Sequence, residues 1–569
     1  MADRLQSRDD FLRYQEAARQ RWDETWNGSR LVVSVGIDSS SIPKGALRVL
    51  AACRRALEGT DAIVREVSGN GAMWMEPFVE IRRPGEPPIV YGWISEDEVP
   101  ALLAGQMKSS AVGVRGPEAF DGIPPLDEHP FFRHQLRIVL AEAGIIQPES
   151  IEDAIARGAY NSLFKVLFEM TPEETIAEVT ASGVRGRGGA GFPAGVKWES
   201  GRKARATPKF VVVNSHEGEP NVYKDRRIHE ADPHKILEGM LISAVTCGAE
   251  RAYNYIGGEY PLAIRRFRKA AADAKRLGLI GDNILGSGKS VEVRVGTGGG
   301  AYICGEGSAL MYSVMGVRGQ PRTKPPRSVE EGLWRRPTIL NNTETLSNIP
   351  AIIDRGGEWF SQIGTSTSSG TKLMTVQGPL KHVGLVEVRM GITLRTLIEE
   401  VWGGMRDGHE FRGIQTGGVS AGPLTEDYLG YAVDFDSMTE IGGMLGSGGF
   451  VVFDQNVCPV DFARYLMAFN RVESCSKCVP CRLGNPALVE ILDRIRLGGG
   501  SVDDLSLIDR TSKHIIELSL CGLGQVAPMP LLGMKKMYPE TFREHAEGHV
   551  CSSGVCPMSA QSILATAAD

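Results

Sequence analysis

Three cysteines at two-residue intervals, Cys475, Cys478 and Cys481, restrict the fold of this 569-residue chain more than any other feature. Three thiolates with this spacing can converge on one metal centre, so the surrounding segment has to fold around that centre. Cys521 lies in a glycine turn after a predicted helix and is the nearest downstream candidate for a fourth ligand. Four cysteines fit a [4Fe–4S] cluster; a zinc ion bound by four cysteines and buried thiols without a metal are the alternatives.

Length and charge narrow the class of protein. At ~150 residues per domain, the length predicts about four domains. The net charge of −6 lacks the positive field that attracts nucleic acid, so no nucleic-acid partner is expected. No apolar run reaches the ~18 residues of a membrane helix and the polar start has no signal-peptide core, so we expect no membrane partner and a cytoplasmic location. Ten cysteines are too few for a disulfide scaffold of this length.

The order of predicted elements indicates an α/β multidomain protein. A β-α-β-β-β-α pattern after the first helix suits a thioredoxin-like domain, and a later alternation of strands and helices indicates a mostly parallel sheet covered by helices. Short strands with glycine-rich turns, as in a β-grasp domain, precede a helical tail. The predicted boundaries are 1–30 for the N-terminal helix, 31–105 for the thioredoxin-like domain, 106–180 for a linker and helical segment, 181–365 for the parallel-sheet domain, 366–455 for the β-grasp domain and 456–569 for the helical domain and tail.

Glycine is enriched, at 68 of 569 residues, or about 12% against a usual ~7%. The loop 182–193 contains a Gly-x-Gly-x-x-Gly match at Gly186, Gly188 and Gly191. The dinucleotide fingerprint needs a strand before it and a helix after it, whereas a predicted helix precedes this loop, so we reject that interpretation. The backbone amides of the loop can still bind a planar ring or a phosphate. The alternative interpretation is an ordinary flexible loop. Three nearby residues add positive charge: Arg185, Arg187 and Lys197.

A second glycine run, residues 296–302, follows the predicted strand 291–295 and precedes a helix that begins near Glu306. The free amides and the positive end of the helix would suit a phosphate or diphosphate. A tight packing turn is the alternative interpretation.

Five motifs in order carry a family resemblance: Arg185–Trp198, Asn214–Pro220, Ala301–Glu306, Asn341–Thr345 and Cys475–Cys481. Together they resemble the flavin-containing NADH-oxidising subunit of respiratory complex I, over about residues 130–545. The same module occurs in NAD-reducing hydrogenases and in NAD-dependent molybdenum or tungsten formate dehydrogenases. The resemblance implies FMN over a Rossmann-like domain, then a β-grasp domain, then a helical bundle that holds the [4Fe–4S] cluster.

Carried over by motif, the resemblance assigns residues to the flavin and the dinucleotide. Hydride would pass from the nicotinamide of NADH to FMN, and no side chain would act as a nucleophile. Glu217 and Glu219 would line the nicotinamide and ribose side, Phe192 would lie beneath the adenine, and Glu306 would border the pocket. The expected FMN contacts are Gly186, Arg187, Gly188, Lys197, Asn214, Tyr302, Asn341, Asn342 and Thr343.

Several positions depart from the family pattern. His216 replaces an acid that normally meets the pyrimidine edge of the flavin, and Gly307 replaces a second glutamate that faces the ribose. Ser200 and Arg327 stand where aromatic residues usually help to enclose the adenine. Without that acidic group at the ribose, and with an added arginine, discrimination against a 2′-phosphate would relax, so NADP stays open beside NAD.

The front domain resembles the thioredoxin-like [2Fe–2S] domain that accompanies this module, but its ligands are replaced. Gly69 and Met73 stand in place of the second cysteine pair, and residues 38–41, Asp-Ser-Ser-Ser, form the loop of the first. Cys53 lies on the apolar face of a predicted helix and is interpreted as a core residue. We therefore expect residues 31–105 to act as a docking domain without a cofactor.

Four residues near the C-terminus, Cys458, His545, Cys551 and Cys556, could form a structural tetrahedral zinc site. Some flavin subunits of multimeric hydrogenases are similar in this respect. Reduced thiols near the end of the chain are the alternative.

The resemblance predicts the diaphorase (beta) subunit of a cytoplasmic NAD-dependent formate dehydrogenase, with formate oxidised on a separate molybdopterin alpha subunit that carries iron–sulfur clusters. The enzyme alternatives are the diaphorase subunit of an NAD-reducing hydrogenase and a complex I subunit. A hypothesis of another class is a non-catalytic scaffold or ligand sensor, which predicts a protein without flavin.

Overall fold

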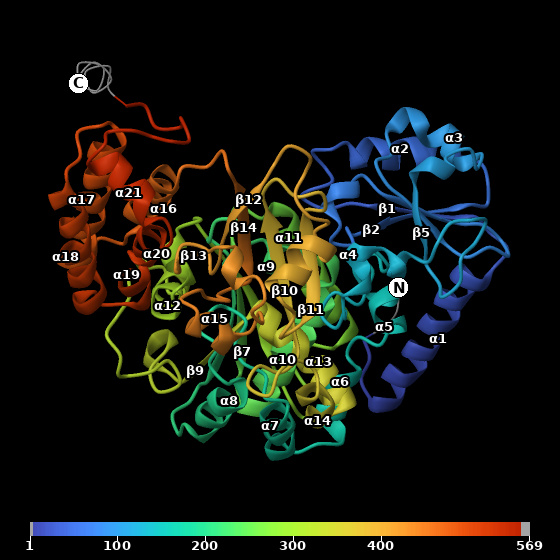
Figure 1. Cartoon of the computed structure of the whole chain (residues 1–569). Helices are drawn as coiled ribbons and strands as arrows, with labels where there is room; N and C mark the ends of the chain where they lie inside the picture. The colour runs from blue at the N-terminus through green and yellow to red at the C-terminus, as the bar shows by residue number, and fades with distance from the viewer. Residues whose placement is uncertain (1–3, 559–569) are drawn as a thin grey trace.

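The computed structural model describes residues 4–558, which form three β-sheets and a helical tail. Figure 1 shows the N-terminal sheet domain in blue and the helical tail in red at opposite ends, with the two other sheets between them. Among the described helices, none is both long and apolar enough to cross a bilayer. The predicted domains 1–30 and 456–569 extend at their ends beyond the described residues.

The front domain is a five-stranded sheet in the order β2-β1-β3-β4-β5, in which β1 pairs parallel with β2 and the other pairs are antiparallel. Its last strand lies beyond the boundary predicted at residue 105, so that boundary is too early. The four residues of β5 sit among glycines and prolines, and this hid the strand from pattern analysis. The elements are α1 (Arg8–Asn27), β1 (Val32–Gly36), α2 (Ala46–Ala56), β2 (Ile63–Val67), β3 (Val79–Arg82), β4 (Ile89–Tyr91), α3 (Val99–Leu103) and β5 (Ala111–Val114).

Short helices connect the front domain to the central sheet. The N-terminal α1 packs against α5, and one apolar core runs from Phe11 on α1 through Leu163 on α6 to Val211 in the central sheet. The front helix is therefore part of the main body. The connecting helices are α4 (Pro130–Arg133), α5 (Ile151–Ala156), α6 (Asn161–Phe168) and α7 (Pro172–Ala181).

The central domain has a four-stranded sheet, β8-β7-β6-β9, in which every pair is parallel. Helix α10 begins as the sequence predicts, because Pro233 occupies its first position and Asp232 accepts a hydrogen bond from the amide of Lys235 (3.0 Å). The carboxyl ends of parallel strands share one edge, where loops can assemble a site. The elements are α8 (Ala194–Lys203), β6 (Phe210–Ser215), α9 (Lys224–Ala231), α10 (Pro233–Cys247), β7 (Arg251–Gly257), α11 (Pro261–Leu277), β8 (Glu292–Gly298), α12 (Gly307–Val314), β9 (Thr338–Asn342), α13 (Thr343–Arg355) and α14 (Gly357–Ser361).

The third sheet has the order β11-β10-β14-β12-β13, with β10 and β14 parallel and the other pairs antiparallel. The apolar pattern of residues 394–402 favours a short helix, and the structure has a π-helical turn there, at Thr396–Val401. Apolar residues of this sheet share a core with Val67 and Phe78 of the front domain. The elements are β10 (Thr371–Gln377), β11 (Gly384–Arg389), β12 (Phe411–Gln415), β13 (Pro423–Leu424), α15 (Phe435–Glu440) and β14 (Gly449–Asp454).

The tail is helical, as predicted. Cys475 and Cys478 lie between α16 and α17, Cys481 lies in the first turn of α17, and Cys521 immediately precedes α19. The α/β prediction is confirmed, while the thioredoxin-like, Rossmann-like and β-grasp assignments stay predictions. The helices are α16 (Pro459–Glu473), α17 (Val479–Arg496), α18 (Val502–Leu518), α19 (Gly522–Val526), α20 (Met529–Met537) and α21 (Pro539–Ala546).

Candidate functional site: a cavity beside four cysteines

A cavity of about 370 Å³ lies at the carboxyl edge of the central sheet. Its walls come from the glycine loop, the ends of β6 and β9, the third sheet and the tail. The lining residues are Gly188, Gly189, Ala190, Asn214, His216, Glu217, Gly218, Glu219, Val222, Lys224, Asp225, Tyr302, Gly305, Glu306, Asn342, Gly417, Ser420, Met444, Gly446, Ser447, Gly522, Leu523 and Val526.

Amide side chains at the strand ends tie this edge together. The side-chain amide of Asn214, at the end of β6, donates to the carbonyl of Gly305 (2.9 Å). Asn342, at the end of β9, accepts from the amide of Glu344 (2.9 Å) and so caps α13. The hydroxyl groups of Ser215 and Thr343 lie 2.6 Å apart. These bonds hold the floor of the cavity before any ligand binds.

The glycine loop closes on itself, because the amide of Gly186 donates to the carbonyl of Phe192 (2.8 Å). Gly188 lines the cavity, but the side chain of Arg187 does not. The buried guanidinium of Arg187 donates instead to the carbonyl of Ser369 (2.6 Å), while its backbone amide donates to Thr345 (2.9 Å). The guanidinium also donates to the carbonyl of Arg185 (3.2 Å), so the side chain of Arg187 supports the loop from behind and does not enter the cavity.

Two buried acids face the cavity from the segment after β6. Burial and the neighbouring Asp225 raise the pKa of Glu217 to about 7, against the lowering effect of Lys224. Burial likewise raises the pKa of Glu219 to about 7, although the hydroxyl of Ser447 donates to it. Gly418, at a φ of +59°, approaches Glu219 so closely that a Cβ there would lie 1.9 Å from its carboxylate oxygen. The third sheet thus shapes the pocket of Glu219.

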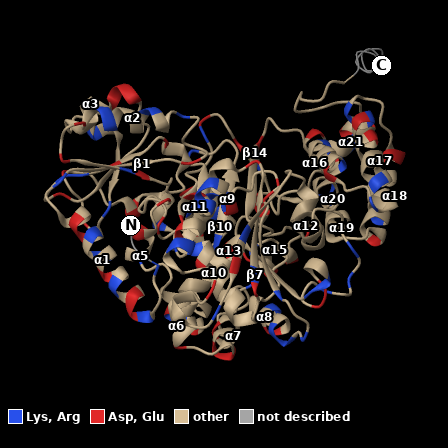
Figure 2. Ribbon diagram, turned by 180° about the vertical axis from the view of Figure 1, so that it is seen from behind, with Lys and Arg blue, Asp and Glu red and all other residues tan. Residues whose placement is uncertain are grey.

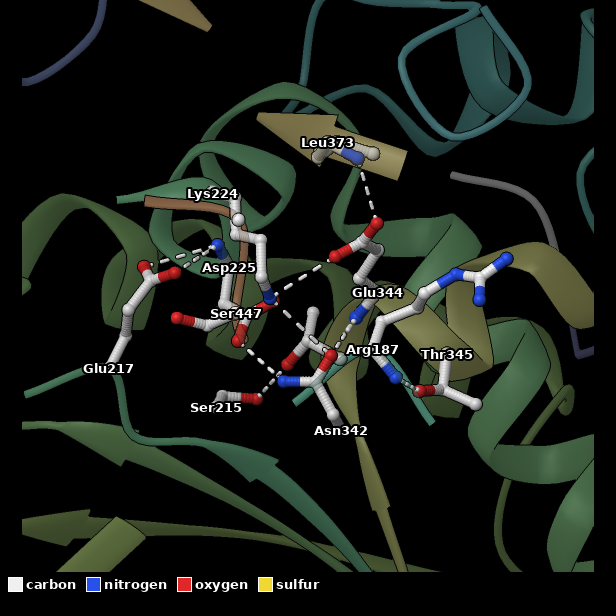
Figure 3. Close-up of polar contacts among 12 residues, drawn as sticks. Arg187, Ser215, Glu217, Lys224, Asp225, Asn342, Glu344, Thr345, Leu373 and Ser447 are labelled. Atoms are coloured by element: carbon white, nitrogen blue, oxygen red, sulfur yellow. Dashed lines mark hydrogen bonds and ion pairs between the residues drawn. The ribbon is translucent and has the colours of Figure 1, made fainter. Parts of the chain in front are cut away.

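Behind these acids lies a buried ion-pair network (Figure 3). Lys224 is 2.6 Å from Asp225 and 3.3 Å from Glu344, and Lys372 of β10 is 2.6 Å from Glu344. Asn342 donates to the second oxygen of Asp225 (2.6 Å). In Figure 2 the basic and acidic ribbon segments lie together around α9 and β10 in the middle of the molecule. The network joins the floor of the cavity to the third sheet.

The two ammonium groups set the charge of Glu344. Burial alone favours the neutral acid, but Lys372 and Lys224 lower the pKa of Glu344 below its ordinary value. Burial in turn lowers the pKa of Lys372 to about 8 in spite of Glu344. The pair is therefore charged at neutral pH only because its members lie side by side.

His216 lines the cavity and stacks on Tyr255 at 5.9 Å between ring centroids. Both of its ring nitrogens, and the side-chain nitrogen of Asn341, are buried without a hydrogen-bond partner among the described residues. Buried polar atoms of this kind usually have a partner, so a polar, planar ligand in the cavity would satisfy the ring nitrogens of His216, which lines it. This observation fits a flavin.

Glu306 and its neighbours form another part of the wall. The Glu306 carboxylate accepts from the amides of Ser308 (2.9 Å) and Ala309 (3.0 Å), which caps α12, and it lies 3.0 Å from Lys324. A Cβ at Gly307 would lie 2.5 Å from Leu340, so a glutamate there would displace that side chain.

Two predicted residues, Phe192 and Lys197, do not line the cavity. The Phe192 ring is 44% exposed, and the ammonium of Lys197 lies 5.9 Å from its centroid. Lys197 donates to the carbonyl of Leu340 (2.6 Å), and burial lowers the pKa of Lys197 to about 8.

The structure brings seven predicted cofactor-site residues to the cavity wall: Gly188, Asn214, Glu217, Glu219, Tyr302, Glu306 and Asn342. Gly186, Arg187, Phe192, Lys197, Asn341 and Thr343 are not part of that wall. Sequence reasoning missed Lys224, Asp225, Met444 and Ser447. The glycine run around Ser447 was a visible signal, but nothing in the pattern related it to this loop edge.

The four predicted cluster ligands are free thiols beside the cavity. The Cys481 sulfur accepts from the side-chain amide of Asn485 (3.3 Å), a contact that would also stabilise a metal-bound thiolate. Cys475 and Cys521 pack against the apolar cluster that contains Ile303. The donor set and its mixed apolar and amide surroundings fit a [4Fe–4S] cluster.

The cavity and the cysteines share a wall. Cys521 is followed directly by Gly522 and Leu523, both of which line the cavity. The tail is held there by the amide of Tyr302, which donates to Glu473 (2.8 Å), and by Lys477, which donates to the carbonyl of Pro321 (2.6 Å). The start of α19 therefore connects Cys521 directly to the cavity wall.

The second cysteine group lies further along the tail. One ligand atom from each of Cys458, His545, Cys551 and Cys556 lies within 4.8 Å of the other three. His545 Nε2 is 3.4 Å from the sulfurs of both Cys458 and Cys556, and its Nδ1 bonds the carbonyl of Thr541 (2.8 Å). A hydrogen bond from Cys556 lowers the pKa of Cys458 to about 3. Three sulfurs and an oriented imidazole fit tetrahedral zinc.

These features define a class: a cofactor-binding protein whose ligand cavity adjoins cysteines that fit an iron–sulfur centre. Residues 179–351 match the Complex1_51K family, the Nuo51 FMN-binding domain, and residues 461–545 match the NADH-ubiquinone oxidoreductase-F iron–sulfur binding region. The chain belongs to the family of 51 kDa-type flavin subunits of NADH-quinone oxidoreductases. It is an oxidoreductase subunit with FMN and a [4Fe–4S] cluster as cofactors and NAD as substrate.

Two curated relatives show the extent of the similarity. The NADP-reducing hydrogenase subunit HndC of Solidesulfovibrio fructosivorans is 46% identical over 74% of this chain and 86% of its own length. The F 2 subunit of the NADH-quinone oxidoreductase of Rhizobium meliloti is 45% identical over 70% of this chain and 94% of its own. A chain of the NAD+-reducing [NiFe]-hydrogenase in the H2-reduced state shares the fold, with TM-score 0.65, 24% identity and coverage of 95% of this chain and 87% of that one.

Replacement of Glu344 by Gln should lower the free energy of unfolding by about 3–5 kcal/mol, because the variant leaves the ammonium of Lys372 buried without an anion. Urea unfolding followed by tryptophan fluorescence measures the change. Glu399→Gln is the control: Glu399 is half exposed and paired with Arg395, so its loss should cost less than about 1 kcal/mol. Equal losses in the two variants would contradict the assigned role of Glu344.

The KM for NADH should rise as the pH increases through 7. Glu219, with its pKa raised to about 7, is neutral below that pH and ionised above it, where it adds negative charge to the cavity that the family resemblance assigns to an anionic dinucleotide. Glu219→Gln should reduce the KM at pH 8 by about fivefold, roughly 1 kcal/mol, and leave it nearly unchanged at pH 6. Dye-coupled kinetics at both pH values measure this. The exposed Glu358→Gln serves as the control. A Glu219→Gln variant whose KM at pH 8 equals that of the wild type would refute the assignment.

Proposed function

We propose that this chain is a diaphorase subunit, which exchanges hydride between NAD(H) and FMN and passes single electrons through its [4Fe–4S] cluster to or from a catalytic subunit. FMN, when bound, accepts two electrons from the nucleotide and can release them one at a time. The observation that best supports this proposal is the wall that the cavity and the cysteines share. Gly522 and Leu523 line the cavity, and they directly follow the candidate ligand Cys521 in the chain.

The residues divide this work among them. The amides around Gly188 and the side chains of Asn214 and Asn342 surround the space proposed for FMN, and Tyr302 closes it on the side of the tail. Glu217 and Glu219 are proposed to face the nicotinamide and ribose. The chain thereby orients hydride donor and acceptor and needs no nucleophile of its own.

For the metal centre we propose that Cys475, Cys478, Cys481 and Cys521 hold the [4Fe–4S] cluster. Their position between the cavity and the outer helices of the tail supports this assignment. Tyr302 spans the junction, since its ring lies 5.3 Å from that of Phe469 on α16.

For the catalytic partner we propose a molybdopterin alpha subunit that oxidises formate. The absence of any molybdopterin-like motif in this sequence supports substrate chemistry on a separate chain. A hydrogenase catalytic subunit is the second candidate, favoured by the 46% identity to HndC and by the likeness to the [NiFe]-hydrogenase chain over most of this protein.

Purification of the native complex tests these proposals together. We expect a yellow-brown preparation with one FMN and at least four irons per chain, which reduces a dye with NADH. Molybdenum or tungsten with formate-dependent NAD reduction supports the formate dehydrogenase assignment, and nickel or H2-dependent reduction overturns it in favour of a hydrogenase. A colourless protein without dye reduction would contradict the diaphorase function and favour a scaffold.

We also propose that Cys458, His545, Cys551 and Cys556 bind a structural zinc ion that ties α16 and α21 to the end of the described chain. The close approach of the four ligand atoms supports the site, and a tail fixed in this way would hold the cluster helices against the cavity.

A variant with Cys551 and Cys556 both changed to Ser should lose one zinc per chain and should melt at a lower temperature, while it keeps its iron. Metal analysis and a thermal melt measure both effects. The control is Cys53→Ser in the front domain, where the thiol is a buried core residue remote from the tail. Unchanged zinc content in the double variant would refute the site.

A further inference from the structure

Helix α9, Lys224–Ala231, is an anomaly of this fold. Its sequence, Lys-Asp-Arg-Arg-Ile-His-Glu-Ala, is dominated by ionisable residues, yet every side chain except that of Arg226 is buried. Burial of so many charges is unfavourable unless each one is paired. The partners of α9 therefore indicate what the helix does, and they lie in two different domains.

The first turn of α9 lines the cavity and bonds to other residues of its wall. The amides of Asp225 (3.0 Å) and Arg226 (3.2 Å) donate to the carboxylate of Glu217, which thereby closes the N-terminus of the helix. Lys224 and the Asp225 side chain belong to the network with Glu344. A shift of α9 along or across its axis would move Glu217, which faces the proposed dinucleotide site.

The rest of the helix is bonded to residues of the front domain. The guanidinium of Arg227 contacts the carboxylate of Asp38, donates to the hydroxyl of Ser40 (3.0 Å) and lies 3.7 Å from Glu76. Glu230, one turn on, accepts from the amide of Ser39 (3.1 Å). The loop of residues 38–41 is thus clamped to one face of α9.

This clamp occupies the place where the related [2Fe–2S] domains are expected to hold their cluster. A Cβ at Gly69 would lie 1.8 Å from the carboxylate of Asp38 and 2.5 Å from the guanidinium of Arg227. A cysteine at position 69 is therefore incompatible with the ion pair. Three of the residues that stand in place of cluster ligands, Asp38, Ser40 and Gly69, are the ones that make room for the arginine or bond to it.

The buried acids around Arg227 make its guanidinium essential for the contact between the front domain and α9. The side chains of Asp38, Glu76 and Glu230 are each 1% exposed and surround the Arg227 guanidinium, which is 4% exposed. Lys44, 3.5 Å from Glu76, is 42% exposed and compensates less. Loss of one member of such a buried group leaves uncompensated charge and is strongly unfavourable.

We propose that the front domain acts through Arg227 as a clamp on α9, so that Arg227 is a positioning residue for Glu217 in the dinucleotide site. In this chain, the contact between the front domain and α9 occupies the position of the cluster. This inference rests on the proposed function of the cavity, but its structural part, the coupling of the Arg227 pair to the amides that hold Glu217, does not need that function.

The test compares three variants in the full complex. Arg227→Gln removes the cation, Arg227→Lys keeps it, and Arg115→Gln is the matched control, because Arg115 pairs with the buried Glu80 (2.7 Å) inside the front sheet and has no bond to α9. The readouts are kcat and KM for NADH with a dye acceptor, thermal stability, and hydrogen exchange of the Asp225 and Arg226 amides.

Arg227→Gln should raise the KM for NADH about tenfold, with kcat changed less than about twofold, because Glu217 is displaced while the flavin chemistry stays intact. Exchange at the Asp225 and Arg226 amides should accelerate. Arg227→Lys should restore most of both properties, and Arg115→Gln should lower stability without either effect. If Arg227→Gln fails to fold, Ser40→Ala, which removes the hydroxyl between Arg227 and Asp38, should show the same changes to a smaller degree.

Unchanged KM and unchanged amide exchange in Arg227→Gln, or equal effects in Arg227→Gln and Arg115→Gln, would overturn the inference. A wild-type complex that does not oxidise NADH would instead contradict the proposed function. In that case accelerated exchange at the two amides would still support the clamp, and unaltered exchange would still refute it.

Discussion

Buried carboxylates need cations at fixed positions, and this constraint organises the centre of the molecule. Glu344 and Asp225 meet Lys372 and Lys224 at the carboxyl edge of the parallel sheet, where none of the four side chains is more than 4% exposed. Because an isolated charge there would be strongly unfavourable, the third sheet and the central domain can adopt only an arrangement that keeps these pairs together. The floor of the cavity is therefore rigid before a ligand arrives.

Each domain contributes a different part of the site proposed for the redox chemistry. The central sheet supplies the floor, the third sheet supplies Ser447 beside Glu219, and the tail supplies Leu523 and the candidate ligand Cys521. The front domain contributes no lining residue but contacts α9 through Arg227. Each domain thus has a physical task at one site, which explains how a front domain without cluster ligands can remain useful.

Much of the fold follows from local patterns in the sequence, and the exceptions share a cause. Apolar segments predicted β6, β7 and β8 but not the short β9, and Asp232 and Pro233 predicted the start of α10, while the metal centre inferred from the cysteine spacing stays a prediction. Helix α9 places only Ile228 and Ala231 in the apolar core, and ion pairs accompany the burial of its other residues, so apolar periodicity could not reveal its role. The inward turn of the Arg187 side chain and the contact of Ser447 with Glu219 depend on distant segments and were equally invisible.

The most direct measurement of the central claim is freeze-quench electron paramagnetic resonance of the protein mixed with NADH, with flavin absorbance followed in parallel. If the cavity and the four cysteines form one electron path, the flavin absorbance should fall first and the signal of a reduced [4Fe–4S] cluster should appear within the same turnover. A flavin that is bleached by NADH while the cluster stays oxidised, with no other electron acceptor present, would contradict the shared wall as a route for electrons.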